Sequence, residues 1–184
     1  MDTLSGIPSV IFGLFGMAFF GNTLGLGYSL LSGSLTMALL VLPLIVTNAR
    51  EAIRAVPKGC RSGALGLGAG RWYMIRTVLL PAAMPGVLTG ITLAAGRIAG
   101  ESAALLFTAG SAGMLPRLGT NPAENARVLG EKIFQPGGTL TIELYLQVQK
   151  GQFGNAFAIS SVLMITVLAA NFALKTAGRG RRTK

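Results

Sequence analysis

The sequence predicts an all-α, polytopic membrane protein, and three observations lead to this class. Hydrophobic residues make up 51% of the 184-residue chain, charged residues only 12%, and the mean hydropathy is +0.60. Residues 3–49 carry no charge at all. A soluble domain usually has about 25% charged residues, so this chain has too little polar surface for one. The same hydrophobicity excludes an intrinsically disordered chain.

Four apolar stretches are each close to the ~20 residues that a helix needs to cross the hydrocarbon core of a bilayer. They lie at about residues 7–22, 31–49, 83–108 and 156–174, and the Gly-rich segment 21–33 joins the first two. We therefore expect about four spanning helices that form a single transmembrane domain from the whole chain.

The basic residues predict the orientation of these helices. Residues 50–81 hold six bases against one acid, and the tail 175–184 holds five bases, whereas residues 111–154 are nearly neutral. Short loops rich in Lys and Arg stay in the cytoplasm. We therefore expect residues 50–81, the tail and both termini inside, and residues 111–154 outside. A nucleic-acid-binding protein is also basic, but its bases do not alternate with long apolar runs.

Pairs of glycines within the apolar stretches have the spacing that lets two helix backbones approach closely in lipid. Packing within the chain is the simpler interpretation, and contact with a partner subunit is the alternative. The pairs are Gly21 and Gly25, Gly86 and Gly90, and Gly96 and Gly100.

The residues of the chain argue against an enzyme. It has no His and a single cysteine, Cys60, so it lacks the residues for a His-ligated metal, a Ser-His-Asp triad or a disulfide. The sequence also lacks the phosphate-binding pattern G-x-x-x-x-G-K-[ST]. We expect no catalytic residue, no metal site and no resident cofactor. An intramembrane enzyme would need a nucleophile and a base within a span, where only Arg97 and Glu101 are available.

Arg97 and Glu101 are the only charges deep within a predicted span, four residues apart on one helical face. Ionisable residues at this depth cost several kcal/mol and mark functional sites by default. A guanidinium binds phosphate oxygens through paired donors. We therefore expect an anion pathway in which Glu101 pairs with Arg97 when the site is empty. A structural ion pair between neighbouring helices is the alternative.

Residues 61–81 read RSGALGLGAGRWYMIRTVLLP. They predict two short helices, 59–67 and 71–80, separated at Gly68–Gly70. Such a basic amphipathic loop could lie on anionic lipid. The loop also resembles the EAA loop of ABC-importer permeases, whose pattern is E-A-A, three residues, G, nine residues and I-x-L-P. The matching positions are Ser62, Gly63, Ala64, Gly68, Val78, Leu80 and Pro81, with Ser62 and Gly63 replacing the Glu and the first Ala.

The resemblance extends over nearly the whole chain. The segments GIPSVIFGLFG (6–16), EAIRAVP (51–57), LPAAMPGVLTGITLAAGRIAGESAALLFTAG (80–110) and TLTIELY (139–145) are similar to the PstA family of phosphate-importer permeases, which have the MetI-like fold. Those permeases have six helices, and the present chain corresponds to the last four. The resemblance implies a phosphate-transporting subunit of a prokaryotic cell membrane, in which the segment with Arg97 and Glu101 lines the translocation route.

The resemblance also implies a set of partners. They are a second, PstC-like permease, a PstB-like ATP-binding dimer that binds ATP and Mg²⁺, and an extracytoplasmic, PstS-like phosphate-binding protein. The lipid bilayer is the remaining partner, and no nucleic acid is expected. The EAA-like loop would receive the movement of the ATPase and pass it to the spanning helices. Two alternatives stay open: a permease of a related importer for another solute, and a membrane scaffold without transport activity.

Overall fold

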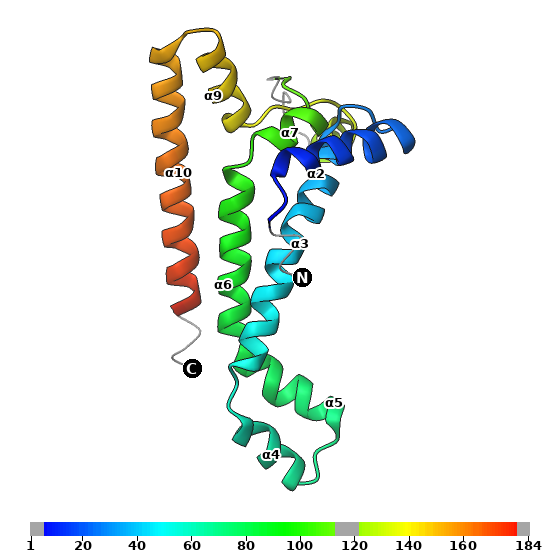
Figure 1. Cartoon of the computed structure of the whole chain (residues 1–184), viewed down its shortest axis with the longest axis vertical. Helices are drawn as coiled ribbons and strands as arrows, with labels where there is room; N and C mark the ends of the chain where they lie inside the picture. Colours follow the sequence, from blue (N-terminus) through cyan, green and yellow to red (C-terminus); the bar gives the residue numbers. More distant parts are fainter. Residues whose placement is uncertain (1–5, 113–121, 180–184) are drawn as a thin grey trace.

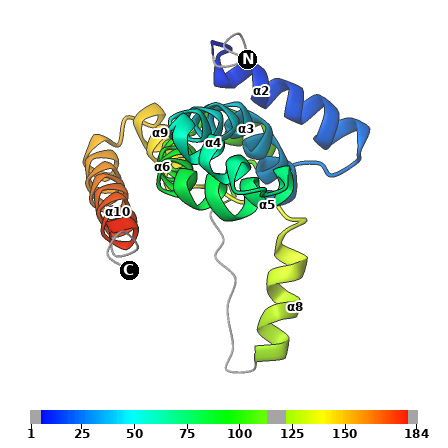
Figure 2. The ribbon, with the colours of Figure 1, turned by 90° about the horizontal axis from the view of Figure 1, so that it is seen from below.

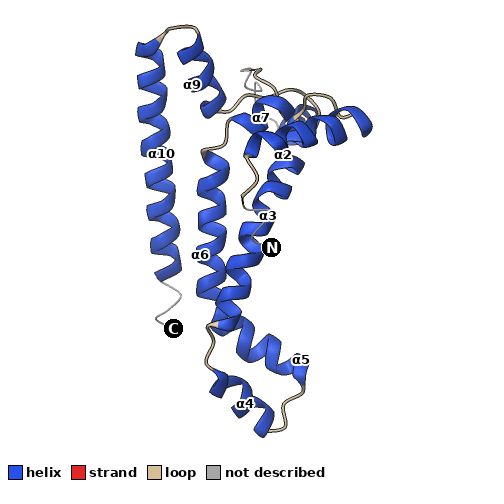
Figure 3. Ribbon diagram, viewed as in Figure 1, coloured by secondary structure: helices blue, strands red, loops and turns tan. Residues whose placement is uncertain are grey.

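A computed structural model describes the backbone of residues 6–112 and 122–179, without the side chains of residues 123, 124 and 174–179. Every regular element in these two ranges is a helix (Figure 3), which confirms the all-α class. Three helices in the described part are long and apolar enough to cross a membrane. They are Leu30–Arg54, Arg71–Ala99 and Phe153–Ala173.

The three long helices run along the long axis of the molecule (Figure 1). They are α3 (Leu30–Arg54), α6 (Leu80–Ala99) and α10 (Phe153–Arg179). Glycines bring α3 and α6 together, because a Cβ at Gly86 would lie 2.5 Å from Cβ of Ala52 and one at Gly90 would lie 2.6 Å from Cβ of Asn48. This pair therefore packs within the chain, as expected. Among the described residues, no atom lies within 4 Å of a Cβ built at Gly96.

The first apolar stretch differs from the spanning helix predicted at residues 7–22. It forms α2 (Ser9–Gly16) and the π-helix η1 (Met17–Thr23). Together they reach about 22 Å, less than the ~30 Å of hydrocarbon. The segment runs crosswise to the long helices and lies beside one end of α3 (Figures 1 and 2). Gly13 permits this position, because a Cβ there would lie 2.8 Å from Cα of Ala104.

The stretch predicted as one span over residues 83–108 is two helices. α6 ends at Ala99, and the short helix α7 (Ala103–Thr108) begins after a break of three residues. α7 packs against α2 and α3, and its residues Ala104, Leu105 and Thr108 are buried. The main core of the described part includes residues of α7 and lies at this end of the molecule. Its buried members are Met37, Leu40, Val41, Ala94, Ala104, Leu105, Ala109 and Ile142.

The predicted cytoplasmic loop is compact and helical. It forms α4 (Lys58–Gly66), α5 (Arg71–Met74) and the π-helix η2 (Ile75–Leu79), which confirms the first short helix and the break around Gly68. The second predicted helix, 71–80, continues into α6 and does not end there. These elements lie at the opposite end of the molecule from α7 (Figure 1). The helix is continuous from Arg71 to Ala99, and α5 runs at an angle to α6 (Figure 1).

The segment predicted outside contains α8 (Pro122–Lys132) and α9 (Leu140–Gln149), and α9 turns directly into α10. Residues 113–121 lie outside the described part of the chain, as do the side chains of the basic tail from residue 175 onward. The inside and outside positions of the termini and of these segments remain predictions.

Candidate coupling element and transport site

The α4–α5 element is fixed to the ends of α3 and α6 by a small apolar core. Its buried members are Val56, Met74, Leu79 and Ala83, with Ala64 of α4 packed against them. Nη2 of Arg61 donates a hydrogen bond of 2.8 Å to the backbone oxygen of Ile53, in the last turn of α3. Contacts of both kinds hold α4 in place, so a force on α4 reaches the two long helices.

The turn between α4 and α5 depends on one glycine. Gly68 has φ +79°, a left-handed conformation that side chains disfavour. Next to this turn, Leu67 is 91% exposed, Trp72 74% and Tyr73 63%. A cleft of about 410 Å³ opens between the two helices. Its lining residues are Cys60, Ala64, Leu67, Gly68, Ala69, Tyr73 and Val78.

The remaining positions of the EAA-like pattern lie on the outside of this element. Ser62 is exposed, and its Oγ donates 3.2 Å to the backbone oxygen of Lys58 one turn earlier. Gly63 is exposed, with open space around a Cβ built there. Leu80 and Pro81 occupy the exposed first turn of α6. The structure therefore brings Ala64, Gly68 and Val78 to one cleft and leaves the other four positions outside it.

The structure does not place Arg97 and Glu101 together as an ion pair. Arg97 is exposed in the last turn of α6, whereas Glu101 is 9% exposed and lies in the break after α6. Oε1 of Glu101 accepts a hydrogen bond of 3.2 Å from the backbone N–H of Ala104, which begins α7. The expected pairing is not seen because α6 ends at Ala99, so the two residues do not share a helical face.

Arg97 nevertheless lies on the same side of α6 as the residues that pack against the rest of the bundle. It follows Gly90 by seven residues and Ala94 by three, and both spacings return to the same side of a helix. Gly90 packs against α3, and Ala94 is part of the main core. Position 97 is thus on the side of α6 that packs against α3 further along the helix, although the Arg97 side chain itself is exposed.

Sequence reasoning missed the threonines that fasten this break to α9. Oγ1 of Thr141 donates 2.9 Å to the backbone oxygen of Glu101, and it lies 2.8 Å from Oγ1 of Thr139. Thr139 also accepts from the backbone N–H of Ile142, so it caps α9. A Thr before the apolar run of α9 is a visible helix-start signal. The contact with Glu101 spans forty residues of sequence and leaves no such signal.

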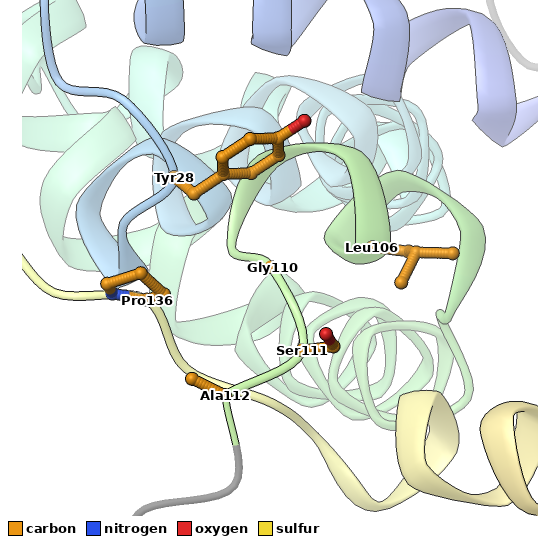
Figure 4. Close-up of a pocket in the computed structure, with 6 residues that line it drawn as sticks. All are labelled: Tyr28, Leu106, Gly110, Ser111, Ala112 and Pro136. Atoms are coloured by element: carbon orange, nitrogen blue, oxygen red, sulfur yellow. The ribbon is translucent and has the colours of Figure 1, made fainter.

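A second cavity at this end of the molecule is separate from both charges. It has a volume of about 450 Å³, and Figure 4 shows the side chains around it. Its lining residues are Tyr28, Leu106, Gly110, Ser111, Ala112 and Pro136, with no charged group among them. This uncharged cavity is therefore not the anion-binding site with a positively charged side chain that the sequence predicts.

Apolar helices long enough to span a membrane, joined to a compact helical element beyond their ends, are typical of the membrane subunit of a transporter. Residues 1–177 match the family described as the binding-protein-dependent transport system inner membrane component. The chain belongs to this family of ABC-importer permeases. No solved structure matches the chain.

Several curated proteins are similar in sequence. The chain is 40% identical to the probable ABC transporter permease protein YqgI of Bacillus subtilis, over 97% of this chain and 62% of that protein. It is 35% identical to YqgH of the same organism, over 84% and 48%. The phosphate transport system permease protein PstA of Xylella fastidiosa is 44% identical over 59% of this chain and 38% of that protein. The chain thus spans about half to three fifths of the length of the first two relatives.

Proposed function

We propose that this chain is a permease subunit of an ATP-driven phosphate importer. The observation that carries the proposal is the α4–α5 element, which packs on the end of α3 and continues as one helix into α6. A permease without ATP chemistry of its own needs such a handle to receive movement from an ATPase. Similarity to proteins named as phosphate permeases supports the choice of phosphate as the solute.

The coupling step follows from the packing of α4. An ATP-binding subunit that docks on the cleft beside Leu67 and Tyr73 contacts an apolar surface. Movement of α4 is passed on through the apolar core at Val56 and through the bond from Arg61 to Ile53. ATP and Mg²⁺ are bound by the ATPase. Because Ser62 stands where the family has a Glu, docking here depends on shape and apolar contact more than on that charge.

Arg97 is the residue that we propose for phosphate binding. Its guanidinium offers planar paired donors, and its side chain is exposed at the end of a spanning helix. Glu101 lies at the start of α7, where its carboxylate accepts a hydrogen bond from the N–H of Ala104. This carboxylate repels a phosphate anion, so Glu101 defines one edge of the proposed site.

The proposed assembly contains a second permease, an ATP-binding dimer and an extracytoplasmic phosphate-binding protein. The chain lies in a prokaryotic cell membrane with the α4–α5 element and both termini in the cytoplasm. The excess of bases in residues 50–81 supports this orientation.

Copurification tests the coupling role. The chain is coexpressed with the ATP-binding and second permease subunits of a phosphate importer, and the bound ATPase is quantified. We expect Leu67→Asp to lower ATPase recovery, because a buried carboxylate at the contact would be unpaired. Gly63→Ala is the matched control, since a methyl group there meets open space. Equal recovery of ATPase with both variants would remove α4 from the docking surface.

Uptake into proteoliposomes tests the solute. The assembled transporter is reconstituted with its ATPase on the inner side of vesicles that contain ATP, and the uptake of labelled phosphate is measured. Unlabelled phosphate or unlabelled sulfate is added outside as a competitor. We expect competition by phosphate alone, and a loss of about 10- to 100-fold with Arg97→Gln, the worth of a hydrogen bond to a charged group. Arg127→Gln, an exposed site on α8, is the control. Uptake that is indifferent to unlabelled phosphate would point to another solute.

A further inference from the structure

We propose that α8 is an interfacial helix that lies along the membrane surface, with its apolar side inserted among the lipids. The helix lies at the end of the molecule opposite to the α4–α5 element. The lipid surface is its partner, and the argument rests on the pattern of its side chains, its height along the bundle and its direction.

The side chains of α8 divide into an apolar and a charged face. Ala126, Leu129 and Ile133 follow one another at spacings of three and four residues, so they share one side of the helix and the turn after it. Leu129 is 47% and Ile133 44% exposed. Arg127 and Glu131 lie on the other side and form an ion pair of 3.3 Å in which both side chains are mainly exposed.

Backbone hydrogen bonds set the height of α8 along the bundle. The N–H of Leu31 donates 2.9 Å to the oxygen of Ile133, and that of Leu30 donates 3.0 Å to the oxygen of Gln135. Leu30 precedes the exposed Arg50 by twenty residues of continuous helix. This separation is about 30 Å, the thickness of the hydrocarbon core. With Arg50 at one edge of the hydrocarbon, Ile133 therefore lies at the other edge.

The direction of α8 is that of a helix on a membrane surface. Figure 2 looks along the long axis of the molecule, with α3 and α6 seen end-on. In this view α8 is seen from the side and extends away from the bundle, so it lies perpendicular to the spanning helices. A helix of this kind at the edge of the hydrocarbon buries its apolar face about 5–10 Å into the boundary between headgroups and acyl chains.

The size of the apolar face favours lipid over a protein partner. Eleven residues make a helix about 16 Å long and about 10 Å wide, so one face covers about 160 Å². A stable protein interface needs about 800 Å² from each side. α8 holds two acids and two bases, so its net charge is zero and insertion does not depend on anionic lipid.

Collision of spin labels with two reagents tests the proposal. The full chain carries Cys60→Ser to remove its own thiol and is reconstituted in vesicles of phosphatidylethanolamine and phosphatidylglycerol. Nitroxide labels are attached at Leu129→Cys and Ile133→Cys, with Arg127→Cys as the control on the opposite face. Oxygen concentrates in the hydrocarbon, whereas a nickel chelate stays in water. We expect the ratio of oxygen to nickel collisions to be several-fold higher at 129 and 133 than at 127.

Two results would overturn the proposal. If the nickel chelate reaches the label at 129 as readily as the label at 127, the apolar face lies in water. If neither oxygen nor the chelate reaches the label at 129, another protein surface covers the face. A second measurement uses a large apolar side chain on the proposed inserted face: Leu129→Trp is made in a Trp72→Phe background. Quenching of this tryptophan by lipids brominated near the headgroup is expected, and absence of quenching counts against insertion.

Discussion

The contact between α3 and α6 makes a quantitative prediction at Gly90. A methyl group there would lie 2.6 Å from Cβ of Asn48, whereas ordinary contacts begin at 3.4 Å, so the two helices must separate by about 0.8 Å. Asn48 cannot turn away freely, because its Nδ2 donates 2.8 Å to the backbone oxygen of Leu44. Crowding of this kind costs about 1–3 kcal/mol.

Gly96→Ala supplies the matched comparison for Gly90→Ala. Both substitutions lie in α6, and both gain about 1 kcal/mol in helix propensity. A methyl group at Gly96 meets open space. The difference between the two variants therefore isolates the crowding. We expect Gly90→Ala to have the lower free energy of unfolding by about 1–3 kcal/mol, or about 5- to 150-fold in the folding equilibrium.

Titration of mixed micelles with sodium dodecyl sulfate, followed by circular dichroism and by label distances between α3 and α6, measures this difference. Gly86→Ala should behave like Gly90→Ala, since its methyl group would lie 2.5 Å from Cβ of Ala52. Equal stability of Gly90→Ala and Gly96→Ala would show that α3 and α6 do not approach as closely as the structure has them, and would refute the reasoning.

Three further predictions concern single residues. Gly68→Ala should destabilise the α4–α5 element by about 1–2 kcal/mol, because φ is +79° there, and faster hydrogen exchange in α4 would report this. Thr141→Val should lower the free energy of unfolding by about 1–3 kcal/mol, since the buried oxygen of Glu101 loses its donor. Thr166→Val, whose exposed hydroxyl bonds only within its own helix, should change it by less than about 0.5 kcal/mol in the same titration. Arg61→Gln should also speed exchange in α4, and unchanged exchange would contradict the role of its bond to Ile53.

The helical class and the break in the helix at Gly68 were predictable, because they depend on local composition and on glycine conformation. The fate of residues 7–22 was not. Their apolar character fits a spanning helix as well as a helix lying across others, and the choice depends on contacts of Gly13 with Ala104, ninety-one positions away. Periodicity within one segment carries no information about such a partner.

The candidate site was predictable in part for a related reason. The sequence singled out Arg97, and its side chain is exposed. Its predicted pairing with Glu101 assumed that one unbroken helix runs through both residues, because the segments before and after them are apolar. Gly100 was the visible warning of a helix end. What the sequence could not show is that Glu101 would turn its carboxylate toward the N–H of Ala104 and its backbone oxygen toward Thr141.

The continuous helix from Arg71 to Ala99 has a mechanical consequence. Its tight contact with α3, at Gly86 and Gly90, lies between its two ends and serves as a fulcrum. Along the helix, Arg71 is at most about 22 Å from Gly86, and Arg97 is about 10 Å beyond Gly90. A tilt about this point therefore moves the two ends in opposite directions. Because the arm from this contact to Arg97 is the shorter one, the Arg97 end moves less far than the Arg71 end.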